Sequence, residues 1–84
     1  MRLKIQEIGN GLHPSEVVVQ IQAIEGPEQL VVDRRSIDQG SIDVEYPVRA
    51  SNGHYLIELP RETTRGAWRL WVAKDMITDI EVAA

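Results

Sequence analysis

Apolar and polar residues alternate most clearly between positions 42 and 59, where they predict two antiparallel strands. Asn52-Gly53 separates the strands and suits a two-residue hairpin loop, because Asn tolerates positive φ and Gly adopts it freely. This loop places Val48 opposite Ile57, so the apolar faces of both strands coincide and form one inner face. The first strand contributes these apolar side chains to that face: Ile42, Val44, Tyr46 and Val48.

Pro47 interrupts the first strand of this hairpin. Proline has no N–H to donate to a sheet, so it is confined to edges, bulges and places where pairing changes. We therefore expect the strand to bend near Pro47.

A third strand is predicted at residues 67–73. Pairing Leu59 with Trp68 extends the inner apolar face through Trp68, Leu70 and Val72. Residues 42–73 are then a three-stranded meander, with a long polar loop before its last strand.

The same register predicts two cross-strand pairs on the outer face of the meander. Glu58 meets Arg69, an opposite-charge pair of a kind that contributes roughly 0.2–1 kcal/mol. Leu56 meets Trp71, although this face is the one expected to contact water. The alternative is that another part of the chain covers these two side chains.

The N-terminal half predicts shorter strands. Residues 3–8 alternate weakly, and Gly9-Asn10-Gly11 reads as the turn that follows them. Residues 17–24 are rich in β-branched side chains, and the glutamines mark the face exposed to water. The face predicted to be buried consists of Val17, Val19, Ile21 and Ala23.

A four-residue loop, Glu25-Gly26-Pro27-Glu28, would return the chain into a strand at residues 29–33. That loop aligns Ile21 with Val32 and Ala23 with Leu30. Residues 34–40 then form a polar connection to the meander.

The chain ends in a pattern typical of small β-domains. Residues 74–77 are too few for an α-helix and suit a single 3₁₀ turn, and residues 78–82 predict a last short strand. No segment predicts a longer helix, so we expect one all-β domain over residues 1–84, a small antiparallel barrel or sandwich of six or seven short strands. The order strand, 3₁₀ turn, strand at the end resembles the layout of Src-homology-type small barrels.

The amino-acid composition excludes some kinds of site and disfavours some kinds of partner. The 84 residues contain no cysteine, so disulfides and thiolate metal sites are excluded. The first residues have no signal-peptide pattern and no segment is apolar enough for a membrane span, so we expect a cytoplasmic protein without a membrane partner. The net charge of −4 disfavours nucleic acid as a partner, because phosphate binding needs many cations.

Residues that could carry catalysis are scattered. His13 and His54 are far apart and lack the spacing of a metal site. The serines and threonines occupy turns without a neighbouring base. Asp43 and Glu45 would lie about 7 Å apart on one strand face, where we interpret them as solubilising charges. We therefore expect a non-enzymatic protein with no catalytic residue, cofactor or metal.

The remaining candidate is the outer face of the meander. Exposed tryptophan flanked by arginine is typical of protein-binding hot spots. We predict an interaction module that binds a protein partner, or a second copy to form a homodimer. The predicted partner-binding residues are Trp71, Leu56, Arg49, Arg69, Arg61 and Arg65.

The alternative is single-stranded nucleic-acid binding through the basic segment at residues 61–74. Its four cations, Arg61, Arg65, Arg69 and Lys74, outnumber its one acid, Glu62. Trp71 would then stack on a base.

Overall fold

Alternating and β-branched segments separated by turns fold into ten short strands and no α-helix in the computed structural model, which describes residues 1–45 and 47–78. The strands are β1 (Arg2–Lys4), β2 (Gln6–Asn10), β3 (Glu16–Ala23), β4 (Gly26–Asp33), β5 (Ile37–Asp38), β6 (Ser41–Asp43), β7 (Arg49–Ser51), β8 (His54–Glu58), β9 (Arg69–Ala73) and β10 (Ile77–Thr78). The 3₁₀ helices η1 (Arg34–Ser36) and η2 (Lys74–Met76) precede β5 and β10. The predicted all-β class and the 3₁₀ turn at 74–77 are confirmed. The described residues form ten strands rather than the six or seven predicted, and η1 is a second 3₁₀ turn where only one was expected.

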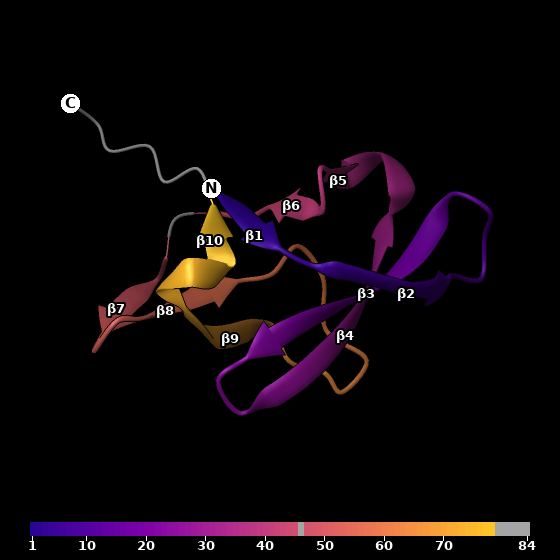
Figure 1. Ribbon diagram of the computed structural model, residues 1–84. Helices are drawn as coiled ribbons and strands as arrows, with labels where there is room; N and C mark the ends of the chain where they lie inside the picture. The colour runs from indigo at the N-terminus through magenta and orange to yellow at the C-terminus, as the bar shows by residue number, and fades with distance from the viewer. Residues whose placement is uncertain (46, 79–84) are drawn as a thin grey trace.

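The strands form three antiparallel sheets with the orders β10-β1-β6-β5, β2-β3-β4 and β7-β8-β9 (Figure 1). These sheets do not close into the barrel considered from the sequence. The predicted last strand begins as β10, which pairs with β1, and its residues 79–82 lie outside the described residues. The chain therefore divides its hydrogen bonding among small sheets rather than one continuous ladder.

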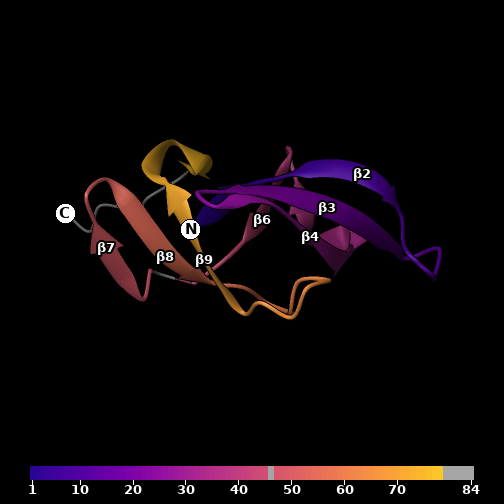
Figure 2. The ribbon, with the colours of Figure 1, turned by 90° about the horizontal axis from the view of Figure 1, so that it is seen from below.

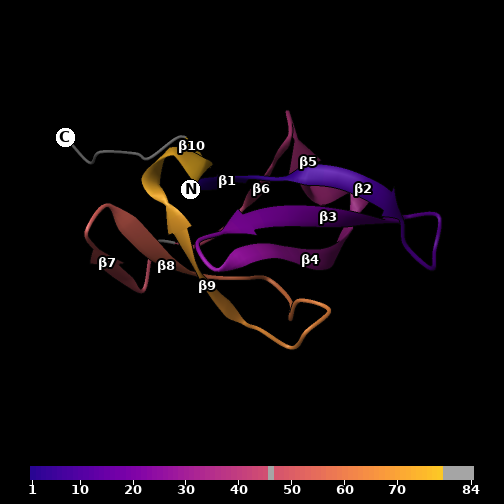
Figure 3. The same ribbon diagram turned by 60° about the horizontal axis from the view of Figure 1, so that its bottom comes forward.

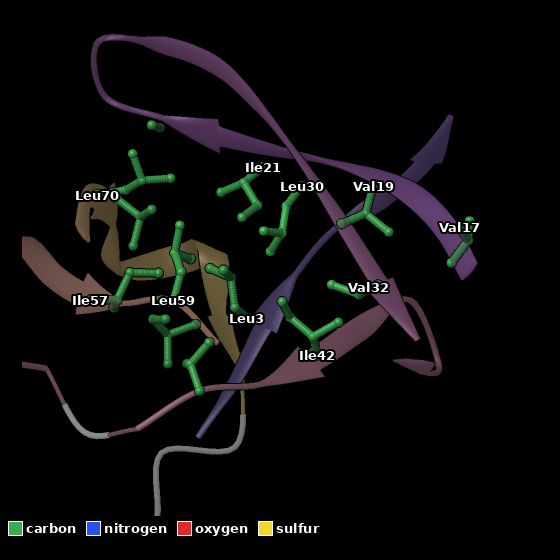
Figure 4. Packing of buried hydrophobic residues seen from close by; sticks show 14 residues of the cluster. Leu3, Val17, Val19, Ile21, Leu30, Val32, Ile42, Ile57, Leu59 and Leu70 are labelled. Carbon is green, nitrogen blue, oxygen red and sulfur yellow. The ribbon is translucent and has the colours of Figure 1, made fainter. Parts of the chain in front are cut away.

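All three sheets contribute to a single apolar core (Figure 4). Leu3 of β1, Ile21 of β3 and Ile57 of β8 have no solvent-exposed surface. The alternation predicted for β3 is confirmed, because its buried side chains are Val17, Val19, Ile21 and Ala23.

The predicted register between β3 and β4 is wrong by four residues. Ile21 pairs with Glu28 rather than Val32, and the chain reverses over Ile24 and Glu25 alone. Gly26, with φ of +136°, starts β4 directly after this two-residue turn. Because the shift is an even number, Leu30 and Val32 still face the core.

Pro47 lies between two strands, after β6 has ended at Asp43 and before β7 begins at Arg49. The chain bends at Val48, next to Pro47, as expected, but the predicted strand is not continuous. The predicted first strand is divided into β6 and β7. β6 pairs with β1 and β5, whereas β7 forms the predicted hairpin with β8. The missing N–H of proline explains why neither strand runs through this position. The predicted inward orientation of Val48 is wrong, since its side chain is 46% exposed, and Tyr46 lies outside the described residues.

The rest of the meander follows the predicted register. Ser51 pairs with His54 across the Asn52-Gly53 turn, where both turn residues have positive φ. Leu59 N–H donates to the Trp68 carbonyl at 2.8 Å, as the predicted pairing requires. The inward orientation of Trp68 is wrong, because this residue precedes β9 and its side chain is 52% exposed.

The predicted turn at residues 9–11 is also wrong. Gly9 and Asn10 belong to β2, with a bulge between Glu7 and Gly9, and the hairpin turns over the following residues. Gly11 N–H donates to the Glu16 carbonyl at 3.1 Å and closes this loop. The first predicted strand is thus two strands, because β1 pairs with β6 and β10 while β2 pairs with β3.

Asp33 caps η1. Its side chain accepts a hydrogen bond from the backbone N–H of Arg35 at 2.9 Å, and the Arg35 guanidinium lies 3.2 Å from its second oxygen. The guanidinium contributes most to holding the pKa of Asp33 below its ordinary value of 3.8, and the backbone hydrogen bond adds to this effect.

Asp33→Asn is expected to reduce stability slightly at neutral pH but not in acid. A carboxyl whose pKa is lower in the folded state stabilises the fold above its ordinary pKa, and this contribution is lost as the pH falls through the lowered value. The difference between wild type and variant should therefore begin to shrink at about pH 4 and disappear only below the lowered pKa of Asp33. Urea midpoints at pH 7 and pH 3 measure it, with the exposed Asp38→Asn as control. An equal difference at both pH values would contradict the capping role.

Candidate functional site

The outer face of β7, β8 and β9 brings the predicted residues Arg49, Leu56 and Trp71 into one row. Arg49 pairs with Leu56, and Leu56 pairs with Trp71, as the sequence predicted. The two apolar side chains are half-buried and Arg49 is exposed. The indole and the leucine therefore lie side by side on adjacent strands.

Arg69 lies in the next row, opposite Glu58. Its guanidinium is 3.9 Å from the Glu58 carboxylate, and both side chains are about half exposed. The predicted cross-strand pair is present, and its exposure makes it a weak contributor to stability. We call the surface formed by Arg49, Leu56, Trp71 and Arg69 the Trp71 face.

Arg61 and Arg65 do not join this row. They lie in the loop between β8 and β9, which reaches β4, where Thr64 N–H donates to the Gln29 carbonyl at 2.8 Å (Figure 2). Arg61 lies 3.4 Å from Glu16, and Arg65 lies 3.5 Å from Glu28. Arg61 lines a separate hollow beside Val32 and Pro60.

The cations of the basic segment 61–74 thus all have partners nearby. Arg61, Arg65 and Arg69 each lie within 4 Å of a glutamate carboxylate. The Lys74 ammonium sits 5.8 Å from the centre of the Tyr55 ring. A phosphate that bound these arginines would therefore compete with the neighbouring glutamates.

Trp71 borders two hollows. The first, of about 190 Å³, lies at the hairpin turn and is lined by Ser51, Asn52 and His54. The second, of about 100 Å³, lies between β9 and the β3–β4 turn and includes Arg69 and Glu28. Ile24 N–H donates to the Trp71 carbonyl at 2.9 Å and holds that turn against β9 (Figure 3). Trp71 thus lies between two hollows, and its backbone carbonyl is held by the β3–β4 turn.

Glu28 is a member of this site that the sequence interpretation missed. From the sequence, Glu28 is predicted to lie in a four-residue loop. In the structure Glu28 belongs to β4 and lies on the same strand face as Leu30 and Val32, which are buried in the core. If the alternation of Val32 and Leu30 had been followed two residues further toward the N-terminus, it would have placed the Glu28 carboxylate on the apolar face of this strand.

A further hollow, of about 380 Å³, is lined by Asp43, Glu45 and Glu58 together with apolar residues. From the sequence, Asp43 and Glu45 are interpreted as solubilising charges. All three acids are exposed, and Asp43 lies 3.7 Å from the terminal ammonium of Met1. Within residues 1–45 and 47–78, no group of three or more His, Cys, Asp or Glu side chains could hold a metal ion.

Three further side chains belong to the residue types considered above for catalysis or metal binding: Thr63, His13 and His54. Thr63 is buried, and its Oγ1 accepts a hydrogen bond from Ala67 N–H at 3.0 Å. His13 is exposed on the β2–β3 loop, whereas His54 borders the hollow at the hairpin turn. These two histidines are thus on different parts of the molecule.

Comparison with known proteins adds no assignment: no family model, no curated protein and no solved structure matches this chain. In the part of the chain that the structure describes, no helix has the length and apolar character needed to cross a membrane.

Proposed function

We propose that this protein is a non-enzymatic interaction module that binds a protein partner, or a second copy of itself, through the Trp71 face. The observation that carries the proposal is the cross-strand row of Arg49, Leu56 and Trp71. It presents an indole and an aliphatic side chain together, with guanidinium groups at Arg49 and Arg69 beside them. Tryptophan and arginine are the residue types enriched in binding hot spots.

The geometry supports this use of the face in a second way. β8 and β9, which carry Leu56 and Trp71, pack their other face into the core through Ile57, Leu70 and Val72, whereas β7, which carries Arg49, is exposed. A binding face on strands anchored in this way loses little conformational entropy when a partner binds. The module would therefore bind with a preformed surface.

Trp71→Ala is expected to weaken association by about 30-fold, the change that corresponds to a hot-spot contribution of roughly 2 kcal/mol. Light scattering at low and high salt measures self-association, and an apolar dimer should persist at both salt concentrations. If wild type is monomeric, immobilised protein is used to isolate a partner, and titration calorimetry compares the variants with the purified partner.

Trp68→Ala is the matched control, because Trp68 is 52% exposed and lies outside the row. It removes the same side chain and should leave association unchanged. If Trp71→Ala altered neither the oligomeric state nor the binding of any partner, while the protein stayed folded by circular dichroism, the proposal would be wrong.

A further inference from the structure

Glu28 occupies a position on β4 where the alternation of buried and exposed side chains predicts an apolar residue. It lies on the same face of β4 as Leu30 and Val32, both buried in the core. Its own side chain is only 14% exposed. A carboxylate at the margin of an apolar core is unfavourable unless its oxygens are hydrogen-bonded or ion-paired.

Those oxygens are incompletely satisfied. Oε2 lies 3.5 Å from Nη1 of Arg65, at the outer limit of a hydrogen bond, and the Arg65 side chain is 78% exposed. Oε1 is buried and has no hydrogen-bond partner among the described residues. An ionised carboxylate can accept about four hydrogen bonds, so the Glu28 carboxylate keeps unused acceptor capacity. Because Oε1 is buried, a donor from outside the chain reaches it only when the side chain turns toward the hollow.

The surroundings of Glu28 suit a cation. The hollow of about 100 Å³ beside it is lined by Glu25, Gly26, Arg69 and Trp71, together with Ala23 and Leu70. Glu25 is exposed and forms no ion pair within the described residues, while Arg69 already lies beside Glu58. Trp71 also lines the hollow, and the face of an indole ring attracts lysine and arginine side chains.

The size of the hollow indicates what kind of cation fits. Sites for cofactors and drug-sized ligands usually occupy about 300–1,000 Å³. A hollow of about 100 Å³ instead matches the head group of one side chain. Gly26 has no side chain to close its side of the hollow. The space beside it is open, since a Cβ added there would meet no atom within 4 Å.

From these contacts we infer that this hollow binds a lysine or arginine side chain of the partner, which donates to Glu28 and lies against Trp71. The inference rests on the proposed function, because it adds the chemistry of the partner to the Trp71 face. Binding then turns the Glu28 carboxylate toward the hollow, where the cation of the partner donates to it. The partner is thus a protein that presents an exposed lysine or arginine.

The test uses small probes whose backbone is blocked. Nα-acetyl-lysine methylamide and Nα-acetyl-arginine methylamide are titrated at millimolar concentration, with Nα-acetyl-norleucine methylamide as the uncharged control. The readouts are the NMR signals of the Trp71 indole N–H and of the backbone amides of Gly26 and Glu28. We expect saturable shifts with the basic probes only, and weaker binding at high salt.

Glu28→Gln and Glu28→Met should each weaken binding of the basic probes at least tenfold. Glu7→Gln, which removes an exposed acid on β2, should not. Thermal unfolding provides the second measurement. Glu28→Met extends the apolar face, so its midpoint should equal or exceed that of wild type.

The inference would be overturned by norleucine shifts as large as those of lysine, by no saturable shift with either basic probe, or by undiminished binding in Glu28→Gln. A lower thermal midpoint for Glu28→Met would also overturn it, because the charge would then serve the fold. Failure here is distinguishable from failure of the proposed function. If Trp71→Ala weakens partner association and the Glu28 variants do not, the proposed function of the Trp71 face holds and only the inferred binding of a basic residue is wrong.

Discussion

Ile57→Ala is expected to lower the free energy of unfolding by about 2–5 kcal/mol, the usual loss when a buried isoleucine is truncated. The Ile57 side chain is 0% exposed and belongs to the apolar core to which all three sheets contribute (Figure 4). Its removal deletes apolar contacts and leaves a cavity that the surrounding strands can only partly fill. Small domains have total stabilities of about 5–15 kcal/mol, so this single change could unfold a large fraction of the molecules.

Urea unfolding followed by tryptophan fluorescence measures this effect. Ile8→Ala is the matched control, because it makes the same truncation at a side chain that is 42% exposed. Its effect should stay within about 0.5 kcal/mol, as for most surface substitutions. Equal losses in the two variants would mean that Ile57 is not packed in the core as the structure describes.

Gly11→Ala is expected to destabilise the protein by about 1–3 kcal/mol, the range found when atoms are forced into a packed site. A Cβ on Gly11 would lie 2.5 Å from the Cβ of Glu16 and 3.1 Å from its backbone carbon. These are atoms of the facing strand rather than the end of a flexible side chain. The β2–β3 hairpin would have to open, and the hydrogen bond from Gly11 N–H to the Glu16 carbonyl would be strained.

Gly9→Ala offers a closely matched comparison two residues earlier in the same hairpin. A Cβ at Gly9 would meet no atom within 4 Å, and Gly9 is not among the glycines with positive φ. Alanine there should leave stability unchanged or raise it by about 0.4–1 kcal/mol, since it restricts the unfolded chain. Chemical denaturation of both variants provides the measurement. A larger loss at Gly9 than at Gly11 would contradict the packing described for this loop.

Local patterns in the sequence predicted what depends on local geometry. Alternation identified the buried face of β3, and Asn52-Gly53 with its flanking residues identified the β7–β8 register. The β8–β9 register followed from the apolar face of these strands, and with it the meeting of Leu56 and Trp71. These features depend on period-two geometry and turn chemistry, which are written in adjacent residues.

The errors arose where the sequence contains competing signals. Gly26 and Pro27 resemble a turn, yet the turn falls on Ile24 and Glu25, which carry no such signal. Alternation could not correct this mistake, because a shift by four residues leaves every side chain on the same face. The position of Glu28 was lost in that mistake, and the candidate site was incomplete without it.

Long-range pairing was beyond prediction for a different reason. Nothing adjacent to β6 indicates that it leaves the hairpin for β1, and the arginines of the β8–β9 loop could not be assigned their glutamates. Such contacts are decided by how the three sheets pack. Charge patterning in the sequence therefore located the cations without identifying their partners.

The pairing of β1 with β10 has a consequence for the kinetics of folding. Thr78 Oγ1 donates to the Arg2 carbonyl across 76 positions of sequence, whereas the β3–β4 and β7–β8 hairpins are closed by adjacent segments. Local hairpins form in about 1–10 μs, but a sheet that joins distant segments must first overcome the entropy of closing a long loop. The hairpins should therefore form first and the β10-β1-β6-β5 sheet last. Folding should take milliseconds to seconds, on the order found for domains rich in distant strand pairs, and stopped-flow fluorescence would measure it.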